Sequence, residues 1–291
     1  MLYDVRLRMS YDYDRPVAGG RHHVRVLPLA VAGRQRVISA SLAVEPHPAE
    51  RLDSADFFGN RVTALTYRDE HRHFSFSMGA RVAVEEAGAP EASSGLEELR
   101  REVETHRSIE PQSPHHFLGP SRLIQPDGDI DEYARQSVTG GASAAEIAED
   151  LSLRINAHFI YDGEATDVRT TPRAAFDLRR GVCQDFAHVM ITGLRGIGIP
   201  AGYVSGYLRT TSPMGVPRLE GADAMHAWVR VWCGEKAGWL EFDPTNAMRA
   251  GEDHIAAGFG RDYSDVAPVI GIMRTLGEQT VSQAVDVVPL G

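Results

Sequence analysis

The segment from Gly181 to Thr245 constrains the fold of this chain more than any other. Downstream of Cys183, small and apolar residues recur with the spacing of one helical face, namely Phe186, Val189, Met190, Gly193, Leu194 and Ile197. We therefore expect a buried helix that begins at the cysteine. Unpaired amide N–H groups and the positive end of the helix dipole face its first turn, and both favour a thiolate. Cys183 is for that reason a candidate nucleophile.

Two strands are predicted next, from Met225 to Trp232 and from Gly238 to Asp243, joined by a turn rich in glycine and charge. A turn centred between residues 234 and 235 sets Arg230 opposite Trp239, Trp228 opposite Glu241, and His226 opposite Asp243. This register places five apolar side chains on one face of the hairpin, namely Ala227, Val229, Val231, Leu240 and Phe242. Cross-strand Cβ atoms lie about 4.5–5.5 Å apart, so a hydrogen bond between His226 and Asp243 is expected.

These three residue types make a catalytic triad. A thiolate attacks a carbonyl carbon, an imidazole accepts and returns a proton, and a carboxylate fixes the tautomer of the ring. The backbone N–H of Cys183 is the first candidate donor to an oxyanion, because it lies at the start of the helix.

Three motifs in series resemble the transglutaminase-like superfamily, specifically its bacterial branch with a β-rich N-terminal region. They are GVCQDFAH around Cys183, MHAWVRVW around His226 and WLEFDPTN around Asp243. The stretches PHPAERLDSADFFGNRV and GRDYSDVAPVIG extend the likeness over nearly the whole chain. The resemblance implies an α+β fold, with a papain-like core in which the Cys helix packs on an antiparallel sheet.

The resemblance also implies an activity: hydrolysis or acyl transfer at amide bonds through a thioester. The substrate would be a peptide or protein with an amide carbonyl, and the acceptor would be water or an amine. Hydrolysis is favoured over crosslinking, because nothing in the chain resembles the calcium sites or additional β-domains of animal crosslinking enzymes. In relatives a second oxyanion donor comes from an upstream side chain, for which Tyr161 and Asn156 are the candidates. Candidate groove residues are Gln184, Trp228 and Trp239.

Three regions are expected along the chain. Residues 1–88 alternate apolar and polar side chains between turn signals, which predicts a small antiparallel β-sandwich. Residues 89–141 lose this period and are expected to be a linker with one short helix. Residues 142–291 are assigned to the catalytic core together with C-terminal strands. Residues 210–225, between a strand and His226, are expected to form a mobile loop over the site.

Composition limits the possible partners. The formal net charge is −10 and Lys and Arg are not clustered, so neither nucleic acid nor an anionic membrane is expected as a partner. No apolar run approaches the ~20 residues of a membrane span, and the N-terminus does not resemble a secretory signal. The two cysteines, Cys183 and Cys233, give no disulfide framework, which fits a cytoplasmic protein with a free thiol. The sequence does not indicate an oligomeric state.

Two other functions remain open. The chain could be a catalytically silent module that binds a peptide or protein in the same groove. It could also hold zinc with Cys183, His226, Asp243 and another histidine, since this mixed set can bind zinc. Direct ligation would replace the bond between His226 and Asp243, and no CxxC or HxxxH spacing supports it. We therefore expect neither a metal nor another cofactor.

Overall fold

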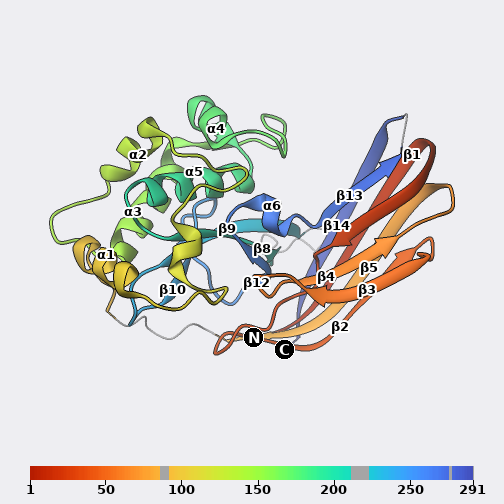
Figure 1. Ribbon diagram of the computed structural model, residues 1–291, viewed down its shortest axis with the longest axis horizontal. Helices are drawn as coiled ribbons and strands as arrows, with labels where there is room; N and C mark the ends of the chain where they lie inside the picture. The colour runs from red at the N-terminus through yellow and green to blue at the C-terminus, as the bar shows by residue number, and fades with distance from the viewer. Residues whose placement is uncertain (86–91, 211–222, 275–276, 291) are drawn as a thin grey trace, which may run out of the picture.

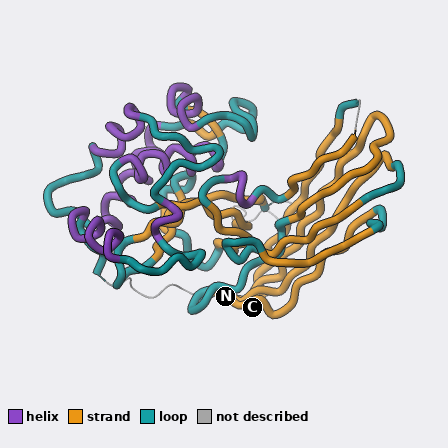
Figure 2. The backbone as a smooth tube through the Cα atoms, viewed as in Figure 1, coloured by secondary structure: helices purple, strands orange, loops and turns teal. Residues whose placement is uncertain are grey.

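The computed structural model describes residues 1–85, 92–210, 223–274 and 277–290 of the chain. They form two large antiparallel sheets, one short parallel pair of strands and a layer of helices, so the chain has the α+β architecture that was expected (Figures 1 and 2). The larger sheet makes one lobe, and the helices gather in the other lobe around the smaller sheet. Within the described residues, no helix is both long and apolar enough to cross a bilayer.

The N-terminal domain is a seven-stranded antiparallel sheet built around one long strand, β1. The first half of β1 pairs with β5 and β14, and its second half pairs with β4 and β13. Alternate side chains of β1 are buried in the domain's core, which agrees with the alternation in the sequence. The strands are β1 (Leu2–Val24), β2 (Gln35–Glu45), β3 (Glu50–Ala55), β4 (Arg61–Thr66), β5 (His71–Val84), β13 (Val269–Arg274) and β14 (Gln279–Leu290).

The two C-terminal strands lie in this N-terminal domain, which corrects the expected boundary of residues 142–291. Strand β14 pairs with β1 along its whole length, from Leu290 opposite Leu2 to Gln279 opposite Tyr13. The chain ends therefore lie side by side (Figure 1). The apolar side chains of β14, such as Val285 and Val287, are fully buried in this domain. Their burial explains why the strand joins this sheet and not the smaller one.

The second domain contains the smaller antiparallel sheet, with strand order β11-β10-β9-β8-β12, the helices packed on it and the separate parallel pair β6-β7. Its strands are β6 (Ile160–Tyr161), β7 (Arg180–Gly181), β8 (Ala201–Leu208), β9 (Ala224–Trp232), β10 (Trp239–Asp243), β11 (Met248–Arg249) and β12 (His254–Gly260). Its helices are α1 (Leu96–Thr105), the 3-10 turn η1 (Pro114–Phe117), α2 (Gly128–Arg135), α3 (Ala144–His158), α4 (Pro172–Leu178), α5 (Cys183–Gly196) and α6 (Tyr263–Val266).

The segment expected to be a linker, residues 89–141, instead belongs largely to the second domain. Helices α1 and α2 bury Leu99 and Ile130 in the same cluster as α5. Gly193 of α5 allows a close approach, because a Cβ there would come within 2.8 Å of the Ala134 side chain. The one short helix expected here is α1, whereas α2 was not predicted because its apolar residues are too few to establish a period. Residues 86–91 lie outside the described residues.

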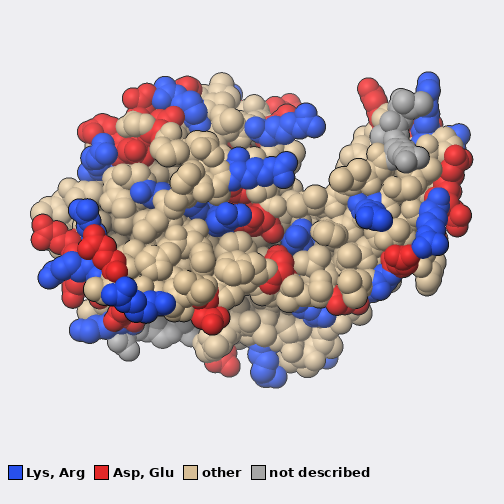
Figure 3. Space-filling view, in the orientation of Figure 1, with Lys and Arg blue, Asp and Glu red and all other residues tan. Residues whose placement is uncertain are grey.

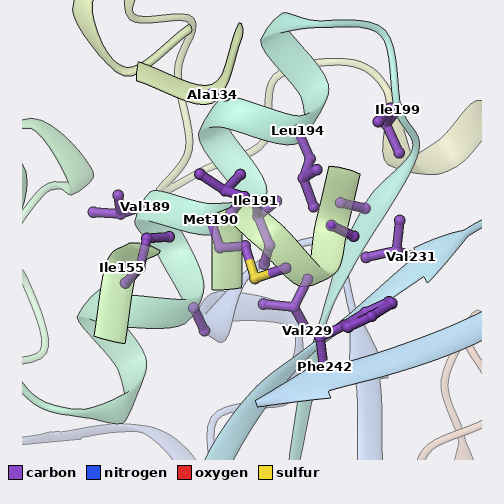
Figure 4. Packing of buried hydrophobic residues seen from close by; sticks show 14 of the residues in the cluster. Ala134, Ile155, Val189, Met190, Ile191, Leu194, Ile199, Val229, Val231 and Phe242 are labelled. Carbon is purple, nitrogen blue, oxygen red and sulfur yellow. The ribbon is translucent and has the colours of Figure 1, made fainter. Parts of the chain in front are cut away.

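Helix α5 begins at Cys183, as predicted, and lies between the other helices and the sheet (Figure 4). On one side it meets Ile155 of α3 and Ala134 of α2, and on the other Val229, Val231 and Phe242 of the sheet. The predicted apolar face of the hairpin is thus the face that packs against the Cys helix.

The pairing of the hairpin is shifted by two residues from the predicted register. Glu241 pairs with Arg230, and Phe242 pairs with Val229. The connection is longer than predicted, because it contains two glycines with positive φ, Gly234 and Gly238. A shift of two keeps every side chain on its predicted face, because side chains alternate with a period of two. Asp243 therefore remains on the face of His226.

Hydrogen bonds through Asn60 join the two domains. The Asn60 amide donates to the Phe259 carbonyl oxygen at 2.8 Å and accepts from the Phe259 N–H at 2.7 Å. Asn60 lies in the stretch PHPAERLDSADFFGNRV, so this stretch takes part in docking the two domains. On the face shown in Figure 3, acidic and basic side chains are interspersed over both domains.

Candidate active site

The start of α5 is fixed by Asp185, which is buried in the first turn of the helix. Its Oδ2 accepts the Val182 N–H at 2.8 Å and the Thr166 hydroxyl at 2.6 Å. Burial raises the pKa of Asp185 from its ordinary value, although these hydrogen bonds oppose the shift. Among the described residues, the backbone N–H groups of Cys183 and Gln184 meet no acceptor. Two donors at the helix start therefore remain available to a developing oxyanion.

His226 and Asp243 form the predicted hydrogen bond across the hairpin. The distance from His226 Nε2 to Asp243 Oδ2 is 2.7 Å, and both side chains are buried. In the observed register, His226 and Asp243 are diagonal neighbours on paired strands, two positions out of direct opposition. Long side chains at such positions can reach each other. Because Asp243 holds Nε2, Nδ1 is the ring nitrogen left for Cys183.

Cys183 and His226 interact electrostatically. Burial alone would lower the pKa of His226, but hydrogen bonds and charge from Asp243 and Cys183 raise it to about 10. The imidazole is therefore protonated at neutral pH. An imidazolium between a carboxylate and a sulfur is the arrangement required for nucleophilic attack by a thiolate.

Asp243 is the centre of a hydrogen-bond cluster that the sequence predicted only in part. Its Oδ2 accepts from His226, from His254 Nε2 at 3.0 Å and from Asn246 Nδ2 at 2.7 Å. Its Oδ1 accepts the backbone N–H groups of Thr245 and Asn246. Burial would raise the pKa of Asp243, but the bonds from His226 and His254 hold it well below its usual value. The carboxylate therefore stays ionised.

His254 and Asn246 are site residues that sequence reasoning missed. Asn246 ends the WLEFDPTN motif and could have been found there, since Asp and Asn three residues apart often share a turn. His254 lies on β12, a strand that was not predicted, and no local motif marks it. The Gly251 N–H donates to His254 Nδ1 at 3.2 Å. The proton of this ring therefore lies on Nε2 and is donated to Asp243.

The two predicted oxyanion side chains are placed differently. The Asn156 amide donates to the Thr245 carbonyl oxygen at 2.8 Å, so it braces the loop after Asp243. Tyr161 is exposed and lies in register with Gly181, two residues before Cys183. Partial burial and the charge of Cys183 raise the pKa of Tyr161. The charge of Cys183 also acts on Tyr203 and Tyr263, whose proximity to the cysteine sequence reasoning missed.

The predicted groove residues do not form one groove. Trp228 is fully buried behind His226, so solvent does not reach it. Trp239 lies four residues before Asp243 on β10, which is a distance of about 13 Å along the strand. Its Nε1 donates to the Gln112 carbonyl oxygen at 3.0 Å. Gln184 stays beside Cys183, where it is mostly buried and its amide reaches the Val168 carbonyl oxygen at 3.4 Å. Most of the loop predicted over the site, residues 211–222, lies outside the described residues.

The second cysteine has a different environment from the first. Cys233 is fully buried, and burial raises its pKa to about 12. Both cysteines are free thiols. Cys183 is partly exposed, so only Cys183 combines access with a nearby base.

His226, Asp243 and His254 also bring potential ligand atoms within 4.8 Å of one another. A histidine that binds a metal usually donates its other ring N–H to an acceptor. His254 does the reverse, because its Nδ1 accepts the Gly251 N–H and its proton remains on Nε2. This donor set is arranged to hold a carboxylate, and it does not suit a metal ion.

Comparisons with known proteins agree with this geometry. The sequence model of the transglutaminase-like superfamily matches residues 131–244, which include Cys183, His226 and Asp243. The model of the bacterial transglutaminase-like N-terminal region matches residues 3–83.

Individual relatives extend the likeness to the whole chain. An uncharacterised protein of Mycobacterium tuberculosis is 35% identical over 294 residues, covering 99% of this chain and 92% of that protein. A protein-glutamine gamma-glutamyltransferase of Pseudomonas aeruginosa is 44% identical over 71 residues, which are 24% of this chain and 10% of that enzyme. The crystal structure of a proposed cysteine protease from Cytophaga hutchinsonii has the same fold, with a TM-score of 0.77 at 23% identity over 100% of this chain and 91% of that one. The chain therefore belongs to the transglutaminase-like superfamily, with the bacterial transglutaminase-like N-terminal region.

Proposed function

We propose that this protein is a cysteine-dependent hydrolase or acyltransferase that acts on amide bonds, in a peptide or at a glutamine side chain. The observation that carries the proposal is the hydrogen bond of 2.7 Å between His226 and Asp243, with Cys183 close enough to raise the pKa of His226. General acid–base catalysis by such an imidazole accelerates a reaction roughly 10²- to 10⁴-fold.

Each residue has a defined part in the proposed reaction. The Cys183 sulfur attacks the carbonyl carbon, and the free N–H groups at the start of α5 stabilise the negative oxygen that forms. His226 Nδ1 gives its proton to the departing amine as the C–N bond breaks, which leaves a thioester. Water or another amine then attacks the thioester and gives a proton back to His226, and the sulfur leaves as a thiolate. Asp243 keeps the ring oriented throughout.

The acceptor in this proposal is water, because hydrolysis requires no second binding site. The short match to the glutamyltransferase of Pseudomonas aeruginosa supports an amine as the other acceptor. Among upstream side chains, Tyr161 is the candidate for a side-chain oxyanion donor in addition to the backbone N–H groups, given its position opposite Gly181. For location we propose the cytoplasm, because a reducing compartment would keep the Cys183 thiol free. Fractionation of cells with an antibody to the protein would test the location.

The activity can be tested with peptide and glutamine-amide libraries scored for ammonia and for new amines. We expect products from the wild type and from Cys183→Ala none above background. Cys233→Ala is the matched control and should retain activity, because that thiol is fully buried. If the wild type and Cys183→Ala released the same products, the proposal would be wrong.

A further inference from the structure

A buried polar chain links the N-terminal domain to the catalytic histidine. Arg34, in the turn before β2, forms an ion pair with Glu241 of β10, and the Glu241 side chain is only 9% exposed. Glu241 Oε2 in turn accepts the Nε1–H of Trp228 at 2.5 Å. Both oxygens of this carboxylate are thus engaged, one by each domain.

The Trp228 ring forms the surface behind the triad. It stacks on His226 with centroids 6.0 Å apart and an angle of 26° between the rings. It also meets His254 edge-on at 5.1 Å. A Cβ at Gly206, the strand partner of His226, would overlap the Trp228 ring, so the ring is closely seated. Movement of this indole would therefore displace both histidines that hold Asp243.

The residue after Arg34, Gln35, contacts strand β12 at the edge of the smaller sheet. The Gln35 amide donates to the carbonyl oxygens of Leu29 and Ala256 and accepts the Ala256 N–H at 2.9 Å. Ala256 lies two residues after His254 on β12. Leu29 packs with Trp228 and Ala256 in one buried cluster. Two consecutive side chains of the N-terminal domain thus contact the strands that carry Glu241 and His254.

Arg34 is the cation bonded to Glu241. The other nearby cation, Arg230, is level with Glu241 on β9 but places its guanidinium over the rings of Trp239 and Phe259. Burial would raise the pKa of Glu241, but the charge of Arg34 lowers it, so the carboxylate stays ionised. Without Arg34 this buried charge would lose its partner, and the carboxylate would move or take up a proton.

We propose that Arg34 is a positioning residue for catalysis: it holds Glu241, which fixes Trp228, on which the reacting imidazole of His226 rests. The N-terminal domain thereby completes the active site. This inference rests on the proposed function, because it assigns Arg34 a role through His226 and Cys183. It gives the N-terminal domain a part in the chemistry beyond docking.

The test is the rate at which iodoacetamide alkylates Cys183, read by mass spectrometry of the labelled peptide across a range of pH. A free thiol is only about 3% thiolate at pH 7, so complete loss of the imidazolium partner can slow alkylation by up to about 30-fold. We expect Arg34→Met to slow alkylation by about tenfold at pH 7 and to move the pH of half-maximal rate upward. Arg25→Met is the matched control, since Arg25 forms a similarly buried ion pair with Asp56 within the N-terminal domain.

A second pair of variants applies if Arg34→Met does not fold, as judged by near-ultraviolet circular dichroism. Trp228→Phe keeps a ring and the Arg34 ion pair but loses the bond to Glu241, so alkylation should again slow. Trp232→Phe changes the same residue type on the same strand and should react as the wild type. Equal rates for Arg34→Met and Arg25→Met, or for Trp228→Phe and Trp232→Phe, would overturn the inference. Slow labelling of wild-type Cys183 would instead refute the proposed function.

Discussion

At the scale of single residues, the site is organised around the Asp243 carboxylate. It is buried and ionised, and it accepts five hydrogen bonds from two histidines, one asparagine side chain and two backbone amides. Hydrogen bonds to a charged group in a protein interior are stronger than those between neutral groups. They fix the position of Asp243, and Asp243 fixes His226.

His254 should therefore contribute to activity without contacting substrate. His254→Phe removes one donor from Asp243, and a bond to a charged group stabilises by about 1.5–3 kcal/mol. We expect kcat to fall about tenfold with little change in KM, since 1.36 kcal/mol corresponds to tenfold in rate. His254→Gln offers an amide donor in place of the imidazole and should recover part of the loss. Equal kcat for the wild type and His254→Phe would show that the bond is unimportant.

The raised pKa of His226 predicts how stability depends on pH. The pKa rises from 6.5 to about 10 on folding, so the folded protein binds this proton more tightly than the unfolded chain. The resulting stabilisation is complete below pH 6.5 and is lost as the pH rises through about 10. In urea unfolding, the wild type should have a higher free energy of unfolding than His226→Gln, and this difference should narrow from about pH 6 to about pH 10. A difference that is constant over this range would contradict the assignment.

The residues of the site differ in how predictable they were. Cys183, His226 and Asp243 stand in motifs whose local sequence reveals a helix start and a hairpin. His254 and Tyr203 reach the site only through the order of strands in the sheet, because β8 and β12 pair with each other. A single sequence does not contain that order, so neither residue could be assigned.

At the scale of secondary-structure elements, α5 and the β9–β10 hairpin set the geometry. The apolar periods predicted both elements and the faces that pack together. The register was wrong by two residues, because a shift of two leaves the apolar pattern unchanged. Only the conformation of the turn distinguishes the two registers, and it depends on the positive φ angles of Gly234 and Gly238.

Strand β7, just before α5, gives a prediction at this scale. Gly181 has a φ of 157°, and a Cβ there would overlap the Asp185 carboxylate that caps the helix. Gly181→Ala should cost about 1–3 kcal/mol of stability, as overpacking does, and should slow alkylation of Cys183. Gly163→Ala is the control, because a Cβ there meets no heavy atom within 4 Å. If both variants had similar thermal unfolding temperatures and similar rates of Cys183 alkylation, Gly181 would not be needed for the capping of α5 by Asp185.

At the scale of the whole molecule, both ends of the chain build the N-terminal domain. The alternation in β14 predicted a strand, but not the sheet that it joins. Its partner β1 is far away in the sequence: Leu2 pairs with Leu290, which is 288 residues further along the chain, and Tyr3 pairs with Pro289. Local sequence carries no record of such a contact, so the predicted boundary at residue 142 separated strands that belong together.

The C-terminal strand should therefore be essential to folding although it lies at the end of the chain. Val287 is fully buried, and Val281 on the same strand is 48% exposed. Val287→Asp places a charge in the core of the N-terminal domain and should cost several kcal/mol. Val281→Asp should have a urea midpoint of unfolding close to that of the wild type. If Val287→Asp were as stable as Val281→Asp, β14 would not be part of this core.

The central claim is that folding brings the Cys183 sulfur to an imidazolium held by Asp243. Competitive labelling with limiting iodoacetamide at neutral pH tests it most directly, with Cys233 as the internal reference. We expect Cys183 to be labelled much faster than Cys233 and faster than a free thiol of pKa about 8.5, and we expect His226→Ala to remove most of this advantage. Labelling of Cys183 at the rate of a free thiol, unchanged in His226→Ala, would contradict it.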